Sequence, residues 1–148
     1  MDIKKMYPPQ KDSPSTYLTG DVGPADTFMF VGSSEVLPSV VPFLLTLGFD
    51  KAVTETVIVT EVGASGQLTV TRGSSPVAWL AGTKCARVWT SDDLMALQHN
   101  ISEIVTEVNT HETAEMPHLI KSKTGDVYRY GFAISEEGGL VFLYEEVK

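Results

Sequence analysis

Residues 91–110 have the sequence SDDLMALQHNISEIVTEVNT, and this stretch decides how the chain is organised. Its apolar residues recur at steps of three and four, which is the period of an α-helix rather than of a β-strand. Thr90 or Ser91 can cap the start of the helix. Asp92 and Asp93 place negative charge in its first turn, where the helix dipole favours anions. The sequence therefore predicts one central helix between segments that show strand patterns.

The apolar stripe of the predicted helix follows a heptad. Its a and d positions are Leu94, Leu97, Ile101, Ile104 and Val108. A helix that packs on its own domain usually has a wider apolar face, and here only Val105 widens the stripe. We therefore predict a self-association interface that resembles a short coiled coil. Isoleucine at both a and d favours three helices over two. The stripe covers only about two heptads, so an ordinary amphipathic helix packed on its own domain is the alternative.

Residues 15–90 show the composition of a β domain. Val, Ile, Thr and aromatic residues are concentrated in short segments, and Gly, Pro, Asp and Ser clusters separate them. The expected strands are Tyr17–Val22, Thr27–Val31, Phe43–Leu47, Thr54–Thr60, Gln67–Thr71 and Lys84–Trp89. Short strands at regular spacing predict a small β-sandwich or barrel.

Residues 111–148 are predicted as a polar connector, 111–126, followed by a β-hairpin. Alternate residues of the two hairpin strands are apolar and would share one face. These residues are Tyr128, Tyr130, Phe132, Ile134, Leu140, Phe142 and Tyr144. Because an isolated hairpin is marginally stable, we expect this face to be buried in packing against the same hairpin of other chains or the end of a helix bundle.

Residues 1–14 are polar and contain three prolines, Pro8, Pro9 and Pro14. This composition is typical of an extended arm, or of a frayed terminus. An arm would become ordered by lying against a neighbouring subunit. The predicted organisation is therefore an arm at 1–14, a β domain at 15–90, an oligomerisation helix at 91–110, and a connector with a C-terminal hairpin at 111–148.

Composition excludes several classes of protein. The chain has 148 residues, with 11 Lys+Arg against 19 Asp+Glu and a net charge of −8, so nucleic-acid binding is not expected. At 43% hydrophobic residues, the chain has material for a core. Cys85 is the only cysteine, so no disulfide forms within the chain, and we expect a buried small apolar side chain there. No membrane span is expected, because the longest apolar run, 40–45, has six residues and contains a proline. No signal peptide is expected either, because no apolar segment follows the lysines in MDIKKMYPPQ (1–10).

No catalytic motif is visible, so neither an enzyme nor a cofactor is expected. The three histidines, His99, His111 and His118, lack the spacing of a helical zinc motif, and scattered polar residues are the simplest interpretation. His111 occupies the next d position of the heptad, so three copies could meet on an axis and hold an ion or a water. Trp79, Trp89, Tyr128 and Tyr130 could form a sugar-binding platform, although packing is the commoner use of aromatic residues.

Several stretches of the chain resemble one family. They are YPPQKDSPSTYLTGDV (7–22), LLTLGFD (44–50), TETVIVTEVGASGQLTVTRG (54–73), AWLAGTKCARVWTSDDLMALQHNI (78–101) and EMPHLIKSKTGDVYRYGFAISEEGGLVFLYEEV (115–147). Each is similar to segments of virion structural proteins of tailed phages and prophages of Gram-positive bacteria. Those proteins are described as tail-fibre, head-fibre or minor structural proteins.

The resemblance implies a non-enzymatic virion protein that is assembled in the host bacterial cytoplasm and attached to other proteins of the capsid, neck, tail or baseplate. Taken together with the heptad, it predicts a homotrimer. Receptor-binding fibres are usually much longer than 148 residues, which favours a short fibre, a decoration protein or an adaptor. The alternative is a module of the receptor-binding apparatus that binds carbohydrate or the host surface.

Overall fold

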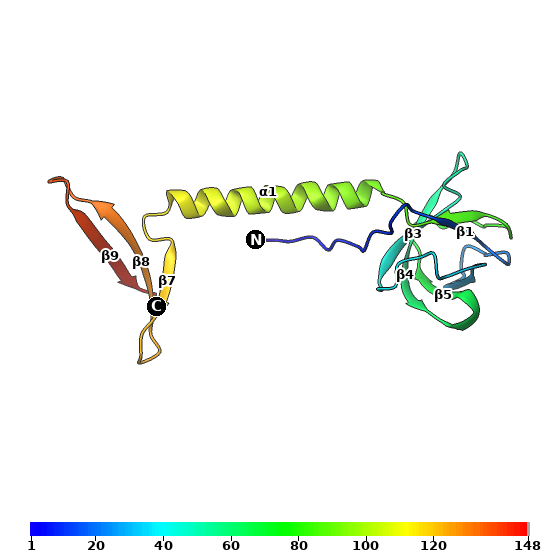
Figure 1. The fold of residues 1–148 in the computed structure, drawn as a ribbon, viewed down its shortest axis with the longest axis horizontal. Helices are drawn as coiled ribbons and strands as arrows, with labels where there is room; N and C mark the ends of the chain where they lie inside the picture. The colour runs from blue at the N-terminus through cyan, green and yellow to red at the C-terminus, as the bar shows by residue number, and fades with distance from the viewer. Residues whose placement is uncertain (148) are drawn as a thin grey trace. The chain divides into compact units, whose positions relative to one another are not determined.

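The computed structural model describes residues 1–147 and is mainly β, with two antiparallel sheets and one α-helix (Figure 1). This confirms the predicted class of a β-rich chain with a single helix. The chain divides into two compact units. We call Lys5–Leu97 the β unit, and Met1–Lys4 with Gln98–Lys148 the helix–sheet unit. The helix begins in the first unit and ends in the second.

The β unit contains a six-stranded antiparallel sheet with the order β1-β6-β3-β4-β5-β2. Its strands are β1 (Ser15–Tyr17), β2 (Phe28–Phe30), β3 (Phe43–Leu47), β4 (Glu55–Val62), β5 (Gln67–Thr71) and β6 (Lys84–Ala86). A short 3₁₀ turn, η1 (Ala64–Gly66), joins β4 to β5, and the two strands pair as an antiparallel hairpin. Gly66 is required there, because its φ is +76° and a Cβ would lie 2.3 Å from the carbonyl oxygen of Val31.

The core of the β unit follows from the alternation of its strands. Val57 and Val59 of β4 point to the same side as Leu68 and Val70 of β5, and all four are buried. Every residue of β3 is buried, which is expected for a central strand. The other large buried side chains include Leu18, Met29, Leu37, Phe43, Leu45, Leu47 and Trp79.

Strands β1 and β2, the first and the last in the order of the sheet, are also linked to each other by backbone contacts. Just beyond β1 and β2, Leu18 forms a β-bridge with Val31. The N–H of Gly32 donates to the carbonyl of Tyr17, and the N–H of Thr19 donates to the carbonyl of Phe30, both at 2.9 Å. The edges of this sheet are therefore not left open at that point.

The helix, α1 (Ser91–Thr113), begins where the sequence predicts but ends three residues later than 110. The expected connector 111–126 is also wrong in part, because it contains a strand, β7 (His118–Lys121). That strand has two apolar residues, Leu119 and Ile120, between polar ends. Four residues are too few to show an alternating pattern, and tertiary pairing decides such a segment.

Strand β7 is paired with the predicted C-terminal hairpin, which consists of β8 (Val127–Ile134) and β9 (Leu140–Glu146). The three strands form an antiparallel sheet with the order β7-β8-β9, seen from yellow to red in Figure 1. Gly131 of β8 allows the backbone of Glu115 to approach, because a Cβ there would lie 1.9 Å from that carbonyl oxygen. The connector therefore packs on one face of the sheet.

The N-terminal arm differs from its prediction. We expected residues 1–14 to become ordered only against a neighbour, yet the arm has partners within its own chain. In the β unit, Arg87 donates hydrogen bonds to the carbonyls of Tyr7 and Pro8. In the helix–sheet unit, Asn100 accepts from the N–H of Lys4 at 2.7 Å and donates to its carbonyl at 3.0 Å. The backbone N–H and C=O groups of an extended segment are not paired with one another. They can therefore bind side chains such as Arg87 and Asn100, which hold the segment in place.

No helix within residues 1–147 has both the length and the apolar character that a membrane crossing demands.

Candidate self-association interface

The predicted heptad stripe lies along one face of α1 and is exposed. Leu94, Ile101, Ile104 and Val108 are each about half accessible in the single chain, with Ile101 at 52%, and Leu97 is half-buried. Val105, the residue that widens the stripe, is exposed as well. The sheet of their own unit leaves Ile101, Ile104 and Val108 uncovered. The stripe therefore has the exposure that an interface between chains requires.

The arm of the same chain occupies a different part of the helix. Its backbone is held by Asn100, by Glu103, which accepts from the N–H of Asp2 at 2.6 Å, and by His99, which contacts the carbonyl of Asp2 at 2.7 Å. In the heptad these three side chains fall at g, c and f, whereas the stripe occupies a and d. The arm therefore leaves the stripe free.

The C-terminal sheet has one strongly apolar face, which we call the aromatic face. The strand register puts on it His118 and Ile120 of β7, Tyr128, Tyr130, Phe132 and Ile134 of β8, and Leu140, Phe142 and Tyr144 of β9. The rings contact one another across the strands. The centroid of Phe142 lies 5.4 Å from that of Phe132, 5.7 Å from that of Tyr130 and 5.9 Å from that of Tyr144.

The aromatic face is not buried within one chain. The seven residues predicted for C-terminal packing do share this face, but Phe132, Ile134, Leu140, Phe142 and Tyr144 are all exposed, with Phe142 at 52%, and only Tyr128 and Tyr130 are half-buried. The opposite face carries an ion pair, Arg129–Glu145 at 3.6 Å, and part of it lies under the connector. The difference between the two faces follows from the period of a strand, which sends alternate side chains to opposite sides.

Two histidines join the stripe to the aromatic face within the helix–sheet unit. His111 is the d residue that follows Ile104 and Val108, and its ring centroid lies 5.0 Å from that of His118. His118 in turn lies 5.1 Å from the ring of Tyr130. One exposed surface therefore runs from Ile101 along the helix and across the sheet. The sequence predicts the apolar stripe and the apolar face of the hairpin separately, but it does not predict that the two form one continuous surface.

A buried ion pair in the β unit fixes the start of the helix. Arg87 is 3% exposed and donates to both oxygens of Asp93, at 2.7 and 2.9 Å. The hydroxyl and the N–H of Thr90 also donate to Asp93, and the N–H of Asp93 donates back to the Thr90 hydroxyl at 3.3 Å. This is a capping box with Asp in the place of Glu. Burial by itself would raise the pKa of Asp93, but these hydrogen bonds outweigh it and lower the pKa.

A second buried ion pair holds the sheet together. Arg72 of the β5–β6 loop donates to both oxygens of Glu55, at 2.5 and 2.8 Å. The indole N–H of Trp79 and the N–H of Val77 also donate to Glu55, at 2.8 and 3.1 Å. Burial acts to raise the pKa of Glu55, but the hydrogen bonds prevail, and the pKa lies below its usual value of 4.5.

These two networks account for the buried charged residues of the β unit. Glu55, Arg72 and Trp79 form one network, and Arg87 and Thr90 with Asp93 form the other. The sequence patterns predict no role for Glu55, Arg72 or Arg87. The sequence nevertheless carries a sign of these roles. Each of the three is a single charged residue beside apolar strand residues, and a charged side chain that is buried there requires a partner. All of these residues have their hydrogen-bond partners within the β unit.

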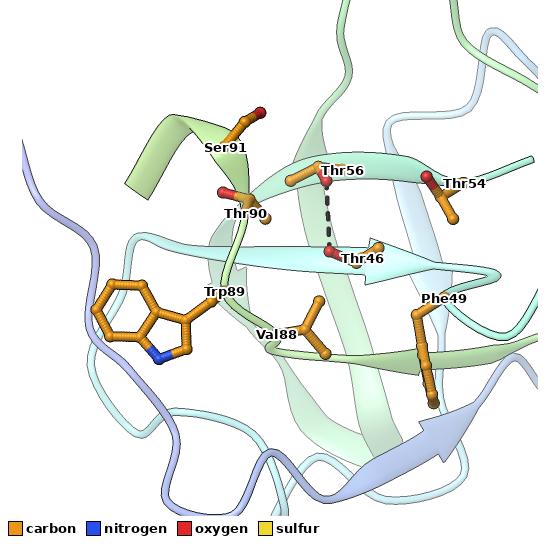
Figure 2. Close-up of a pocket in the computed structure, with 8 residues that line it drawn as sticks. All are labelled: Thr46, Phe49, Thr54, Thr56, Val88, Trp89, Thr90 and Ser91. Atoms are coloured by element: carbon orange, nitrogen blue, oxygen red, sulfur yellow. Dashed lines mark hydrogen bonds between the residues drawn. The ribbon is translucent and has the colours of Figure 1, made fainter. Parts of the chain in front are cut away.

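The predicted aromatic platform is wrong for Trp79, which is buried. Trp79 is 5% exposed and lies in the core, with its N–H on Glu55. Trp89 is 61% exposed and borders a hollow of about 300 Å³ in the β unit (Figure 2). Five of the residues that line this hollow carry hydroxyl groups: Thr46, Thr54, Thr56, Thr90 and Ser91. Figure 2 shows the hydroxyls of Thr46 and Thr56 facing each other, at 3.3 Å.

The remaining candidates give simple outcomes. Cys85 is buried as predicted, and burial raises the pKa of its thiol to about 12, so it is not a reactive thiolate at neutral pH. Within residues 1–147 no three histidine, cysteine or acidic side chains gather closely enough to hold a metal ion.

Comparison of the chain with models of known protein families and with curated proteins finds no match.

Proposed function

We propose that the chain is a non-enzymatic structural protein of a phage virion, and that three copies associate into a short fibre, decoration or adaptor on the particle. The resemblance of most of the chain to tailed-phage structural proteins supplies the class. The observation that supports self-association is the continuous exposed surface of the apolar stripe, the two histidines and the aromatic face.

An assembly of three copies would cover this apolar surface, which a single chain leaves exposed. Ile101 at a and Ile104 at d favour a three-helix arrangement, because a β-branched side chain packs poorly at d in a parallel pair. Three C-terminal sheets around the same axis would each turn the aromatic face inward and the Arg129–Glu145 face outward. Exposed apolar patches of this extent are unusual on a chain that stays monomeric.

In this proposal the β unit is the part that attaches or packs on the particle. We infer that its six-stranded sheet closes into a small barrel, which the hydrogen bonds between the β1 and β2 ends support. Closure removes the free edges that would otherwise pair with other chains. Attachment would then use side chains rather than strand addition. The net charge of −8 favours solubility and an outer position over contact with packaged DNA.

The proposal is tested on particles from the strain that encodes the chain. Antibodies against the purified protein should label intact particles at discrete positions in electron micrographs, and the particle proteins should include the chain in multiples of three per attachment site. Particles that lack the chain would contradict a virion role. Labelling at head, neck, tail or baseplate would identify the attachment partner.

A second candidate function is binding of a host-surface carbohydrate. The observation that favours it is the hydroxyl-lined hollow beside exposed Trp89, since sugars bind by stacking on aromatic rings and by hydrogen bonds to polar groups. The purified protein would bind members of a glycan array, and Trp89→Ala would abolish that binding. Retained binding in Trp89→Ala would place the sugar elsewhere.

A further inference from the structure

His111 and His118 are an unusual pair, because both rings are exposed yet lie against each other. One ends the last turn of α1 and the other begins β7, and their ring planes are inclined by 72°. A hollow of about 290 Å³ lies beside them, and its lining includes residues Glu112 and Glu115. Neutral imidazoles and carboxylates are the usual donors for divalent transition metals.

The spacing of the two rings fits ligation of one ion. Neighbouring imidazoles bound to one ion, at about 2.0–2.1 Å, have ring centres roughly 4.5 Å apart in an octahedral site and roughly 5 Å apart in a tetrahedral site. The observed separation of the centroids is 5.0 Å. One chain does not complete a site, because no cluster of three potential ligands exists within residues 1–147. The missing ligands would have to come from other copies.

The heptad indicates where those copies are. His111 follows Leu97 and Ile104 at the d position, so in a three-fold bundle the three His111 side chains point toward the common axis. Each would bring its own His118 with it. Three copies would offer six imidazoles around one point, at the junction between the helices and the sheets.

We propose that His111 and His118 of three chains form one shared site for a divalent transition-metal ion such as Ni²⁺ or Zn²⁺. This inference rests on the proposed trimer. The ion would join the ends of the three helices, next to Tyr130 and the rest of the aromatic face. It would stabilise the assembly by binding the three-chain form and not the separate chains.

The test uses full-length protein purified without a polyhistidine tag and stripped with EDTA. Equilibrium dialysis against Ni²⁺ should give one ion per three chains, and the melting temperature should rise relative to protein in EDTA. His111→Asn and His118→Asn should each weaken Ni²⁺ binding at least about 10-fold. His99→Asn is the matched control, because His99 contacts the arm, and it should bind Ni²⁺ like the parent.

Light-scattering mass in EDTA separates this inference from the proposed assembly. A three-chain mass with no bound Ni²⁺ overturns the metal site and leaves the trimer intact. A three-chain mass with one ion per chain overturns the shared site. A single-chain mass in both EDTA and Ni²⁺ overturns the trimer and the shared site together. Equal Ni²⁺ binding by the parent, His111→Asn and His118→Asn overturns the assignment to these residues.

Discussion

The β unit buries its large apolar side chains in a core, whereas the helix–sheet unit leaves most of its large apolar side chains exposed. The β unit buries a contiguous core around Phe43, and its buried charges, Glu55, Arg72, Arg87 and Asp93, are all paired. Within its described residues, the helix–sheet unit buries no large apolar side chain, and most of its large apolar side chains are exposed. In residues 1–147, no buried side-chain polar atom lacks a hydrogen-bond partner.

This difference indicates that the two units reach stability by different routes. A sheet with a filled core can fold as a single chain, since the hydrophobic gain is complete within it. A three-stranded sheet with an open aromatic face needs something to cover that face. Substitutions in the β unit should therefore reduce folding of each chain, whereas substitutions on the aromatic face should reduce assembly. Four predictions sharpen this comparison.

The largest effect is expected from Glu55→Ala in the β unit. The change leaves the buried Arg72 guanidinium without its partner and removes the acceptor of the Trp79 indole. Breaking a buried ion pair costs about 3–5 kcal/mol of unfolding free energy. Urea unfolding followed by tryptophan fluorescence measures it. Glu61→Ala, at an exposed site of the same strand, should stay within about 0.5 kcal/mol of the parent, and equal losses in the two variants would contradict the role of Glu55.

Phe142→Ala in the helix–sheet unit should cause a loss of similar size, but in the stability of the assembly rather than in the folding of each chain. If the aromatic face is buried between chains, the assembled form should lose about 3–5 kcal/mol, as for a buried phenylalanine. The loss should appear as a lower melting temperature that depends on protein concentration. Val141→Ala, on the opposite face of β9, is the control. A loss below about 1 kcal/mol would mean that the face stays exposed, and would favour ligand binding.

Acid should weaken the β unit in a defined range of pH. Hydrogen bonds hold the pKa values of Glu55 and Asp93 below their ordinary values of 4.5 and 3.8. Both groups therefore contribute their full stability above about pH 4.5, and lose it as the pH falls through their lowered pKa values. The unfolding free energy from urea titrations should decline below that pH. Glu55→Gln should show a smaller decline, and an identical slope in the two proteins would argue against Glu55 as a source.

The smallest effect is expected where the arm meets the helix. Asn100→Ala removes two hydrogen bonds to the backbone of Lys4, and each contributes about 0.5–1.5 kcal/mol at most. Because the arm is otherwise exposed, unfolding of the chain should change little, while amide exchange of residues 2–4 should accelerate. Asn109→Ala, at an exposed site of the same helix, should leave exchange of these residues unchanged.

The sequence was informative where a pattern repeated over several residues. Strands Phe43–Leu47 and Gln67–Thr71 have the predicted bounds, the helix starts at Ser91, and the hairpin strand starts at Val127. These segments have regular apolar periods or clear turn residues on both sides, which determine local structure. The predicted strand Lys84–Trp89 stops at Ala86 instead, because Arg87 turns to pair with Asp93.

Features that depend on tertiary contacts were not predictable in the same way. The buried pairs Glu55–Arg72 and Arg87–Asp93, strand β7 and the contacts of the arm all depend on which segments meet in space. The stripe residues and the seven aromatic-face residues were named from periodicity alone, and their grouping on one helix face and one sheet face follows from that periodicity. The contact between His118 and His111 is not predictable from the sequence, because the four residues of β7 show no strand pattern and the sequence predicts a connector there.

The central claim is that the exposed apolar stripe and aromatic face are covered by two further copies of the same chain. Sedimentation or light-scattering mass at micromolar concentration tests it directly, on the parent, Ile101→Asp and Ser102→Asp. We predict a three-chain mass for the parent and for Ser102→Asp, whose side chain lies outside the stripe. Ile101→Asp should dissociate, because three carboxylates would meet in an apolar layer. A single-chain mass for the parent, or a three-chain mass for Ile101→Asp, would contradict the account.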